Sequence, residues 1–263
     1  MRTEIAASIT QAFEKAIEIV SDWTSADDPR PYCWFRGIND ATLTLAPGAY
    51  WRTRYNEHET MVEFCREAPA FVPIGSLDSW EAYYLAQHHG IPTRLLDWSD
   101  SFASAIFFAL DRWDGVKEPC IWILRPYAVN EISLKWQGVL CPENHRNDTA
   151  GWLPTGVKTP TIRTSADNFS YNNEWPLAII PTLSNKRLIS QKGTFTVHGI
   201  DKSPIEEFIK IHPTPDEVLA KIVLQACSRE SCKNHLHMLG IRRSTIYPDI
   251  DNFVLDLKES GGW

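Results

Sequence analysis

The sequence feature that constrains the fold most is an almost wholly apolar stretch between residues 101 and 113. Its apolar side chains include Phe102, Ala105, Ile106, Phe107, Phe108 and Leu110. Asp100 or Ser101 can cap the start of a helix there. A helix that is apolar on all sides has no face suited to water, so it has to be buried. The stretch therefore predicts a central helix that the rest of the chain covers.

Length and composition are those of an ordinary globular protein. The chain has 263 residues, of which 43% are apolar and 22% are charged. This length is long for one domain and short for two, so we expect a single domain over residues 1–263. The eleven tryptophans indicate a core and clefts built from large flat side chains.

Charge and hydropathy narrow the choice of partners. The formal net charge of −7 argues against broad binding to nucleic acid or to an anionic membrane. No apolar run approaches the roughly 18 residues that span a bilayer, and the first residues lack the apolar segment of a secretory signal. We therefore expect a cytoplasmic protein that does not bind a membrane, with its six cysteines reduced.

Apolar spacing and chain breakers predict an α+β fold. Apolar residues recur at three- or four-residue steps from Ile5 to Val20 and predict a helix at 3–20. Asp78 and Glu81 fit a capping box for a helix at 79–89. Further helices are predicted at 54–67, 229–239 and 250–257, with a short helix or turn at 185–190. Strands are predicted at 32–38, 120–124, 177–180, 194–198 and 218–224, and residues 129–175 are expected to form an irregular insertion.

The first candidate for chemistry is Arg36, in the segment Trp34-Phe35-Arg36-Gly37. A charged side chain within an apolar strand is costly to bury unless an anion meets it. One interpretation is a structural arginine paired with a carboxylate of the core. The other is an arginine at the strand end that binds a phosphate or carboxylate of a ligand, with Gly37 letting the ligand approach the backbone.

The second candidate is the segment from Gln87 to Trp98, directly before the apolar helix. It holds two imidazoles, a guanidinium, a carboxylate and an indole within a dozen residues. Polar groups this dense near a core are paired with one another or with a ligand. The first possibility is an internal network in which Arg94 pairs with Asp97 and His88 bonds to backbone. The second is a pocket floor, with His89 and Asp97 in reach of ligand hydroxyls.

Other polar clusters give weaker signals. Gln191 lies just before a predicted strand, where an amide can make two directed hydrogen bonds, although a plain helix-to-strand turn explains it equally. Cys227, Cys232, His235 and His237 lie close together, but their spacing fits no familiar zinc pattern, so no metal is expected. Cys33 lies near Arg36, which would favour a thiolate, yet most such cysteines fill the core.

Five motifs together resemble the FRG domain family, which is named for its Phe/Tyr-Arg-Gly motif. They are Trp34–Gly37, Gln87–Trp98, Ala105–Ala109, Gln191–Phe195 and Ser244–Asp249. The resemblance spans about residues 30 to 258, and the middle motif is long and specific. The family is mostly bacterial and phage-associated. This implies a role in toxin or phage-defence systems.

A second resemblance is to enzymes that transfer ADP-ribose from NAD, which implies a split mixed or antiparallel sheet flanked by helices. Arg36-Gly37 resembles their first element, whose arginine holds the pyrophosphate of NAD. The segment from Leu96 to Ser99 resembles the second, which supports the nicotinamide ribose. In the third element, Gly193 stands where those enzymes carry a glutamate that stabilises the cationic ribose. Either Asp97 supplies that charge, or the reaction differs, or the protein only binds.

The resemblance therefore implies a nucleotide-type ligand, NAD, with a protein or nucleic-acid acceptor left open. The residues expected to bind it are Arg36, Gly37, His88, Thr93, Arg94 and Trp98, and those expected to act on it are Asp97, Gln191 and His89. The leading hypothesis is an NAD-using ADP-ribosyltransferase or an NAD-cleaving effector. The alternatives are a non-catalytic sensor or interaction module, and a nuclease that acts through His88, His89 and Asp97.

Overall fold

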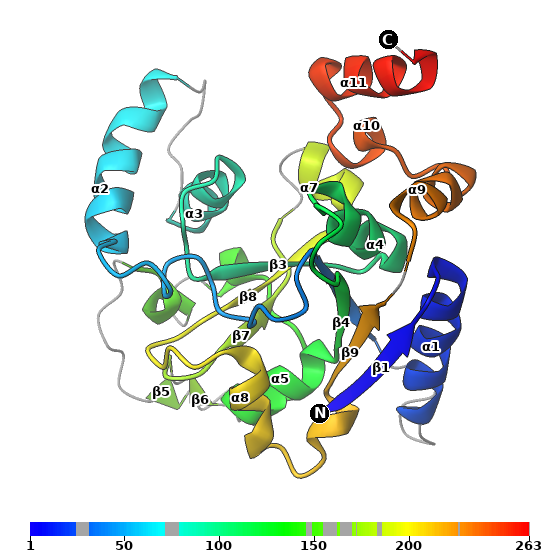
Figure 1. The fold of residues 1–263 in the computed structure, drawn as a ribbon. Coiled ribbons are helices and arrows are strands. Elements are labelled where there is room, and N and C mark those ends of the chain that lie inside the picture. The colour runs from blue at the N-terminus through cyan, green and yellow to red at the C-terminus, as the bar shows by residue number, and fades with distance from the viewer. Residues whose placement is uncertain are drawn as a thin grey trace.

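The backbone forms a seven-stranded mixed sheet flanked by helices (Figure 1), so the α+β prediction is confirmed. The computed structural model describes residues 1–24, 32–71, 79–145, 149–154, 162–163, 170–171, 173–182, 186–225 and 227–262. The strand order is β1-β9-β4-β2-β3-β8-β7. The strands are β1 Arg2–Ala6, β2 Trp34–Ile38, β3 Leu95–Ser99, β4 Cys120–Leu124, β7 Leu177–Ile179, β8 Gly193–Val197 and β9 Leu219–Leu224, with a separate pair β5 Ile162–Arg163 and β6 Ser170–Tyr171.

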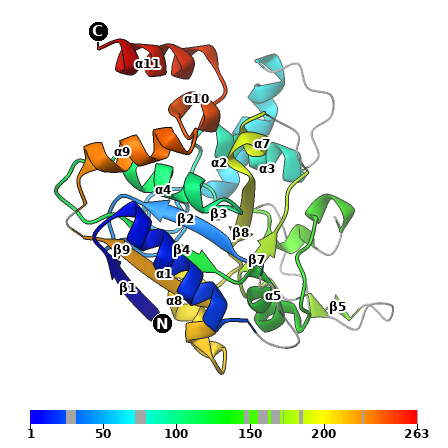
Figure 2. The same cartoon turned by 90° about the vertical axis from the view of Figure 1, so that its right-hand side faces the viewer.

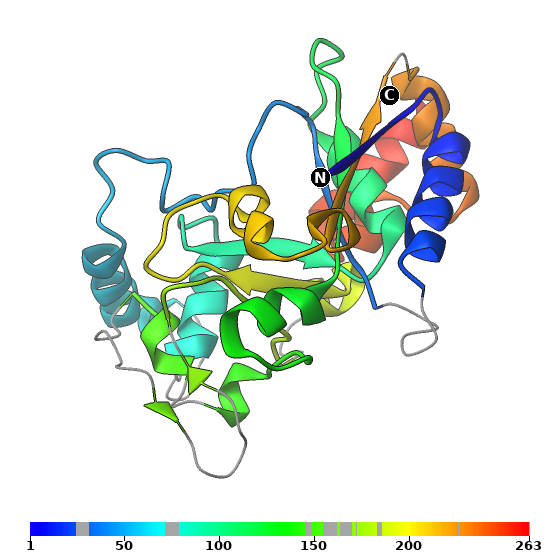
Figure 3. The same ribbon diagram turned by 90° about the horizontal axis from the view of Figure 1, so that it is seen from below.

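Helices cover both faces and the ends of this sheet. They are α1 Ile9–Asp22, α2 Glu57–Glu67, α3 Ser79–His88, α4 Phe102–Asp111, α5 Pro126–Leu134, α7 Lys186–Gln191, α8 Ile205–Phe208, α9 Arg229–Met238, α10 Arg243–Ile246 and α11 Ile250–Gly261. Short 3₁₀ turns occupy Ala68–Ala70, Pro142–Asn144, Ala150–Trp152, Ile209–Ile211 and Pro215–Glu217. Figure 3 shows α2 and α3 at one end of the molecule and α1 at the other, as in Figure 1.

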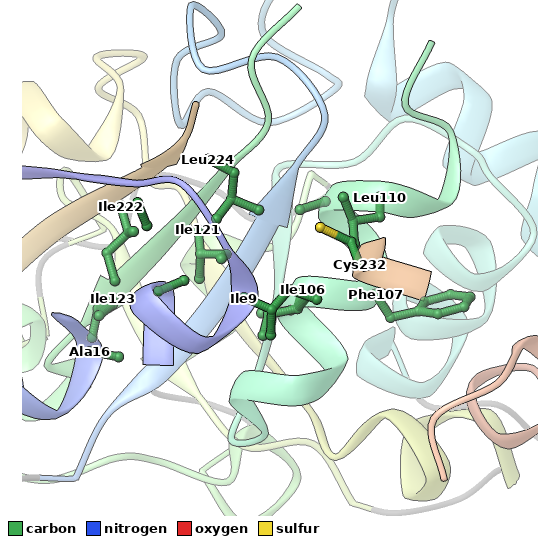
Figure 4. Close-up of a cluster of buried hydrophobic side chains, with 14 of the residues drawn as sticks. Ile9, Ala16, Ile106, Phe107, Leu110, Ile121, Ile123, Ile222, Leu224 and Cys232 are labelled. Carbon is green, nitrogen blue, oxygen red and sulfur yellow. The ribbon is translucent and has the colours of Figure 1, made fainter. Parts of the chain in front are cut away.

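Helix α4 is buried, as its apolar sequence predicts. The side chain of Ser101 caps its first turn by accepting a hydrogen bond from the backbone of Ser104. Figure 4 shows side chains of α4 meeting those of α1, α9 and the strands β4 and β9 in one cluster. The labelled members are Ile9, Ala16, Ile106, Phe107, Leu110, Ile121, Ile123, Ile222, Leu224 and Cys232. The helix therefore forms the centre of the core on this face of the sheet.

The prediction of one helix over residues 3–20 is wrong at its start. Residues Arg2–Ala6 form β1, which pairs in parallel with β9, and the helix α1 begins at Ile9 with Ser8 as its cap. The apolar period of the segment suits a helix, but the hydrogen bonds that β9 offers outweigh this local preference. Figure 2 shows the resulting arrangement, in which α1 lies over β1 and β9.

The start of the expected insertion at 129–175 belongs to the core instead. Residues 126–134 form α5, and the fully buried Asn130 ties this helix to β7. The amide nitrogen Nδ2 of Asn130 donates to the backbone oxygens of Gly138 and Ala178, and its Oδ1 accepts from the nitrogen of Ala178 at 2.8 Å. Much of the later part of 129–175 lies outside the described residues, as does the capping residue Asp78.

The sheet divides between β2 and β3. Strand β2 pairs with β4 along its whole length, whereas it pairs with β3 only at Phe35 and Ser99. Strand β3 pairs along its whole length with β8. The facing edges of β2 and β3 beyond that one pair therefore need other hydrogen-bond partners. This opening positions the candidate site.

Gly37 lets β2 pack directly on α4. A Cβ atom added at this position would lie 1.8 Å from the backbone oxygen of Ala105 and 2.5 Å from the backbone nitrogen of Ala109. Both atoms belong to the backbone of α4, so they cannot swing aside as the end of a side chain can. The packing of β2 on α4 therefore requires a glycine at this position. This is a second reason for the glycine, besides the approach of a ligand that the sequence suggests.

We expect Gly37→Ala to destabilise the fold by roughly 2–3 kcal/mol, because α4 has to move away from β2 to admit the methyl group. Urea denaturation followed by tryptophan fluorescence measures the change. Gly48→Ala is the control, since its new methyl group meets mainly the mobile end of the Arg52 side chain. Equal stabilities of the two variants would contradict the tight contact between β2 and α4.

His198 is buried in the neutral form. It is fully buried beside the ring of Tyr50, at 5.8 Å between ring centres. Burial lowers the pKa of His198 from 6.5 to about 3. The His198 ring binds a proton near pH 6.5 in the unfolded chain but only near pH 3 in the folded protein. The stability contributed by the neutral ring is therefore complete above pH 6.5 and is lost as the pH falls.

Between pH 6.5 and pH 4 we expect the unfolding free energy to fall by up to about 3 kcal/mol through His198 alone. His198→Phe should flatten this part of the pH profile, because phenylalanine has no proton to bind. His89→Gln, which removes an exposed histidine, is the control. Urea denaturation at a series of pH values tests this, and an unchanged profile in His198→Phe would argue against it.

Candidate functional site

A cleft of about 380 Å³ lies where β2 and β3 diverge. The strands β2, β3 and β8 contribute residues to it, and so do the helices α3, α4 and α7 and the residue after α10. The polar and charged lining residues are Arg36, Asn39, Gln87, His88, Asp97, Ser99, Asp111, Arg112, Gln191 and Thr194. Elements that are far apart in the sequence therefore surround one space.

Arg36 spans the opening between the two strands. Its Nη1 donates to the backbone oxygen of Asp97 at 2.5 Å and lies 3.8 Å from the Asp97 carboxylate. Its Nε has no hydrogen-bond partner among the described residues. Burial lowers the pKa of Arg36, while the charge of Asp97 counteracts this. The guanidinium thus satisfies one edge carbonyl and keeps donor capacity that an anion in the cleft could use.

Asp97 is held in place from one side and exposed on the other. Its Oδ2 accepts from Nε2 of Gln87 at 3.0 Å, and the Oε1 of the same glutamine accepts from the hydroxyl of Thr93 at 2.6 Å. Thr93 is only 1% exposed, whereas the Asp97 side chain is 60% exposed. Two neutral side chains therefore orient a solvent-accessible carboxylate without neutralising it.

Gln191 connects the cleft to the last part of the chain. Its Nε2 donates to the backbone oxygen of Ile246 at 3.2 Å, and Ser190 donates to the same oxygen at 3.0 Å. The backbone oxygen of Gln191 accepts from the hydroxyl of Ser99 at 2.6 Å. The side chain thus helps to hold α7 against α10. This is more than the plain helix-to-strand turn that the sequence suggests.

The cleft gathers most of the residues that the sequence singled out. Those that line it are Arg36, Gly37, His88, Asp97, Trp98 and Gln191. The Nε1 of Trp98 donates to the hydroxyl of Thr196 at 2.9 Å, and its side chain is buried in a core cluster with Trp34 and Leu96. His89, Thr93 and Arg94 do not line the cleft. His89 is exposed beside His88, with 5.0 Å between ring centres, and Thr93 acts through Gln87.

Arg94 pairs with Glu57 rather than with Asp97. Its Nε donates to Oε2 of Glu57 at 2.8 Å, and its backbone nitrogen donates to Oε1 at 3.0 Å. The hydroxyl of Tyr83 donates to the same Oε1. Burial alone would lower the pKa of Arg94, but the charge of Glu57 raises it above the ordinary value. The Arg94–Asp97 pair, one of the two possibilities for the segment from Gln87 to Trp98, is therefore not formed.

Sequence reasoning missed the aromatic walls of the cleft. Tyr84 of α3 stacks on Phe195 of β8, with 5.3 Å between ring centres and 12° between ring planes. Phe108 of α4 meets Tyr247 edge to face at 6.2 Å. Tyr247 lies in the late Ser244–Asp249 motif, which was a signal for it, but nothing local marks Tyr84 as a partner of Phe195.

Asp111 and Arg112 at the end of α4 were also missed. Asp111 pairs with Arg243 at 2.7 Å, so its charge is compensated from α10. Arg112 is exposed at the cleft, and its backbone oxygen accepts from Asn39 at 3.2 Å. The second arginine adds positive charge close to Arg36 in the lining.

The cysteines and histidines outside the cleft do not form a metal site within the described residues. None of the six cysteines, all of which lie in the described residues, forms a disulfide, and Cys33 is buried in the cluster beneath α4. Within the described ranges, no three His, Cys, Asp or Glu side chains lie close enough to hold a metal ion. In the same part of the chain, no helix is both long and apolar enough to cross a membrane.

The fold and the cleft define an α+β protein whose ligand-sized cavity opens at a division in its sheet. Residues 31–117 match the family model described as the FRG domain, and the chain therefore contains an FRG domain. The match runs from β2 to just before β4 and includes Arg36 and Asp97. Comparisons with curated proteins and with solved structures give no match. The wider resemblance, which includes Gln191, stays a prediction beyond residue 117.

Proposed function

We propose that the cleft binds NAD and that the protein breaks the bond between nicotinamide and ribose, passing ADP-ribose to an acceptor or to water. The observation that carries this proposal is the convergence of Arg36, Asp97 and Gln191 on one cleft. A guanidinium suits the pyrophosphate of a dinucleotide, and an exposed carboxylate suits a ribose that becomes cationic. The volume of about 380 Å³ lies within the range of small-molecule sites.

The order of the elements supports a likeness to ADP-ribosyltransferases. The Arg36-Gly37 pair lies on one strand, Asp97 lies on a second strand that leads into the apolar helix α4, and Gln191 ends α7 directly before a third strand. These three strands, β2, β3 and β8, are neighbours in the sheet. This is the arrangement that the resemblance of the sequence implies for a site at a split sheet.

The proposed reaction assigns one task to each group. Arg36 holds the pyrophosphate, and the ring of Tyr84 packs against the nucleotide. The bond between C1′ of the ribose and the nicotinamide nitrogen breaks, and the neutral nicotinamide leaves with the electron pair. Asp97 stabilises the positive charge on the ribose. An acceptor oxygen or nitrogen, or water, then bonds to C1′ and releases its proton to solvent.

We expect Asp97→Asn to lower nicotinamide release by roughly 10²-fold, because the amide has the same shape but no charge to stabilise the ribose cation. The measurement is nicotinamide release from NAD by chromatography, with NAD binding followed in parallel. Asp100→Asn is the matched control, since Asp100 is exposed and lies outside the lining. Full activity of Asp97→Asn would remove the carboxylate from the proposed reaction.

The second candidate is an NAD-binding module without turnover. Two observations favour it: the Asp111 carboxylate is already paired with Arg243, and the amide nitrogen of Gln191 is already bonded to Ile246. It predicts saturable NAD binding without nicotinamide release. The nuclease alternative required His88, His89 and Asp97 together, and His89 lies outside the cleft. A role in toxin or phage-defence systems stays a prediction from the resemblance.

A further inference from the structure

A second cavity, of about 560 Å³, lies beside Arg94 and shares no lining residue with the cleft. Its walls come from the loop before α2, the first turn of α2, residues 151–154 and the chain after β8. Tyr50, Tyr55 and Lys202 line it together with Arg94. The cavity is thus a separate space at the start of the strand that carries Asp97.

Two of the charged lining residues of the cavity, Arg94 and Lys202, are cations. Glu57 is its acidic lining residue, and both of its oxygens are already used: Oε1 by Tyr83 and the backbone of Arg94, and Oε2 by Nε of Arg94. In the described residues, no acceptor bonds to the terminal nitrogens Nη1 and Nη2 of Arg94. A guanidinium that uses one edge in this way can still bind an anion with the other.

A second cation, Lys202, lines the same cavity. The centre of the Arg94 guanidinium is 5.9 Å from the ring centre of Tyr50, and the ammonium of Lys202 is 5.5 Å from the same ring centre. Burial raises the pKa of Tyr50 to about 12, so this phenol stays neutral near pH 7 and does not neutralise them. Two cations that line one cavity can share a bound anion.

The cavity lining also contains the hydroxyl of Tyr55. Its oxygen is buried and makes no hydrogen bond of standard geometry within the described part of the chain, with the side chain of Thr60 within reach. The hydroxyl of Tyr50, in contrast, donates to the backbone oxygen of Gly199. A buried polar group of this kind costs stability unless a ligand or water satisfies it. Tyr55 therefore offers a donor in the same lining as Arg94 and Lys202.

We propose that this second cavity binds a small oxyanion, the phosphate or carboxylate group of a ligand, between Arg94 and Lys202, with the hydroxyl of Tyr55 as a further donor. Nothing in this proposal depends on NAD binding in the cleft. Arg94 then has a ligand-binding role, as the sequence suggested, but at a different site. Glu57 fixes the inner edge of its guanidinium, and the outer edge faces the anion.

Titration of the full chain with inorganic phosphate, followed by two-dimensional NMR, tests the proposal. We expect saturable shifts at the backbone amides of Tyr50, Arg94 and Lys202. Lys202→Ala should weaken phosphate binding about tenfold, and Tyr55→Phe about three- to tenfold. Tyr55→Phe is the sharper variant, because it removes only one hydroxyl and should not impair folding.

Two controls separate this site from the rest of the surface. Lys210→Ala removes an exposed lysine that pairs with Glu207, and Arg36→Ala removes the cation of the cleft; both should leave these shifts unchanged. A parallel titration with succinate distinguishes carboxylate from phosphate ligands, and tighter binding of either still supports an oxyanion site. Absence of saturable shifts with both anions would overturn the proposal, as would equal binding in wild type, Lys202→Ala and Tyr55→Phe.

Discussion

Replacing Arg36 with alanine is expected to lower nicotinamide release from NAD by roughly 10³-fold, the largest loss of activity for any single change in the cleft. The variant loses the charge that we assign to the pyrophosphate and also the donor to the backbone oxygen of Asp97. Arg36→Lys should recover part of the activity, because it keeps the charge but not the planar fork that serves two acceptors at once.

Stability has to be measured with the activity of this variant. The lost hydrogen bond to Asp97 alone is expected to cost about 1 kcal/mol of unfolding free energy, which a urea denaturation curve resolves. Arg66→Ala is the matched control, since it removes an exposed arginine whose acidic partners lie on the surface of α2. An Arg36→Ala protein that is folded and as active as wild type would contradict the assigned role.

Glu57→Ala is expected to destabilise the protein by roughly 3–5 kcal/mol, the range for breaking a buried ion pair from one side. Glu57 is buried and accepts from three donors: the hydroxyl of Tyr83, the backbone of Arg94 and the guanidinium of Arg94. The Tyr83 hydroxyl and the Arg94 guanidinium lose their acceptor at once, whereas the backbone nitrogen of Arg94 keeps the Tyr83 hydroxyl as an acceptor. The Arg94 side chain, only 17% exposed, keeps its charge. The loss therefore exceeds that of any surface ion pair.

Chemical denaturation of Glu57→Ala and Glu59→Ala compares two glutamates in the first turn of α2. Glu59 is exposed, so its replacement should change the unfolding free energy by less than about 0.5 kcal/mol. A double-mutant cycle of Glu57→Ala with Tyr83→Phe should show coupling of about 1 kcal/mol or more. Equal stabilities of the two alanine variants would show that the buried network contributes little.

The local sequence pattern was sufficient to predict those elements whose apolar residues match their burial in the fold. The helix at 101–113 was predictable because its apolar residues face the core on all sides, and β4 because its five residues are all buried. Residues Arg2–Ala6 were not, because their strand exists only through pairing with β9, more than 200 residues later. Pairing within the sheet determines that this segment is a strand, and the spacing of its apolar residues gave no indication of this.

The candidate site was predictable only in part, for the same reason. Arg36 was marked by its charge within an apolar strand and Asp97 by the dense polar segment around it, and both line the cleft. The partner of Arg94 was not predictable, because Glu57 lies in α2, far from Arg94 in the sequence. Nothing in the sequence around Glu57 distinguishes it from the exposed glutamates nearby. Gln87 was part of the polar segment, but its bridge from Thr93 to Asp97 depends on how α3 ends against β3.

Calorimetric titration of the full chain with NAD tests most directly whether the opening between β2 and β3 is a dinucleotide site. We expect one site per chain in the wild type, loss of binding in Arg36→Ala and unchanged binding in Lys202→Ala, whose lysine lines the other cavity. No binding in the wild type, or binding that survives Arg36→Ala, would contradict the assignment of NAD to this cleft.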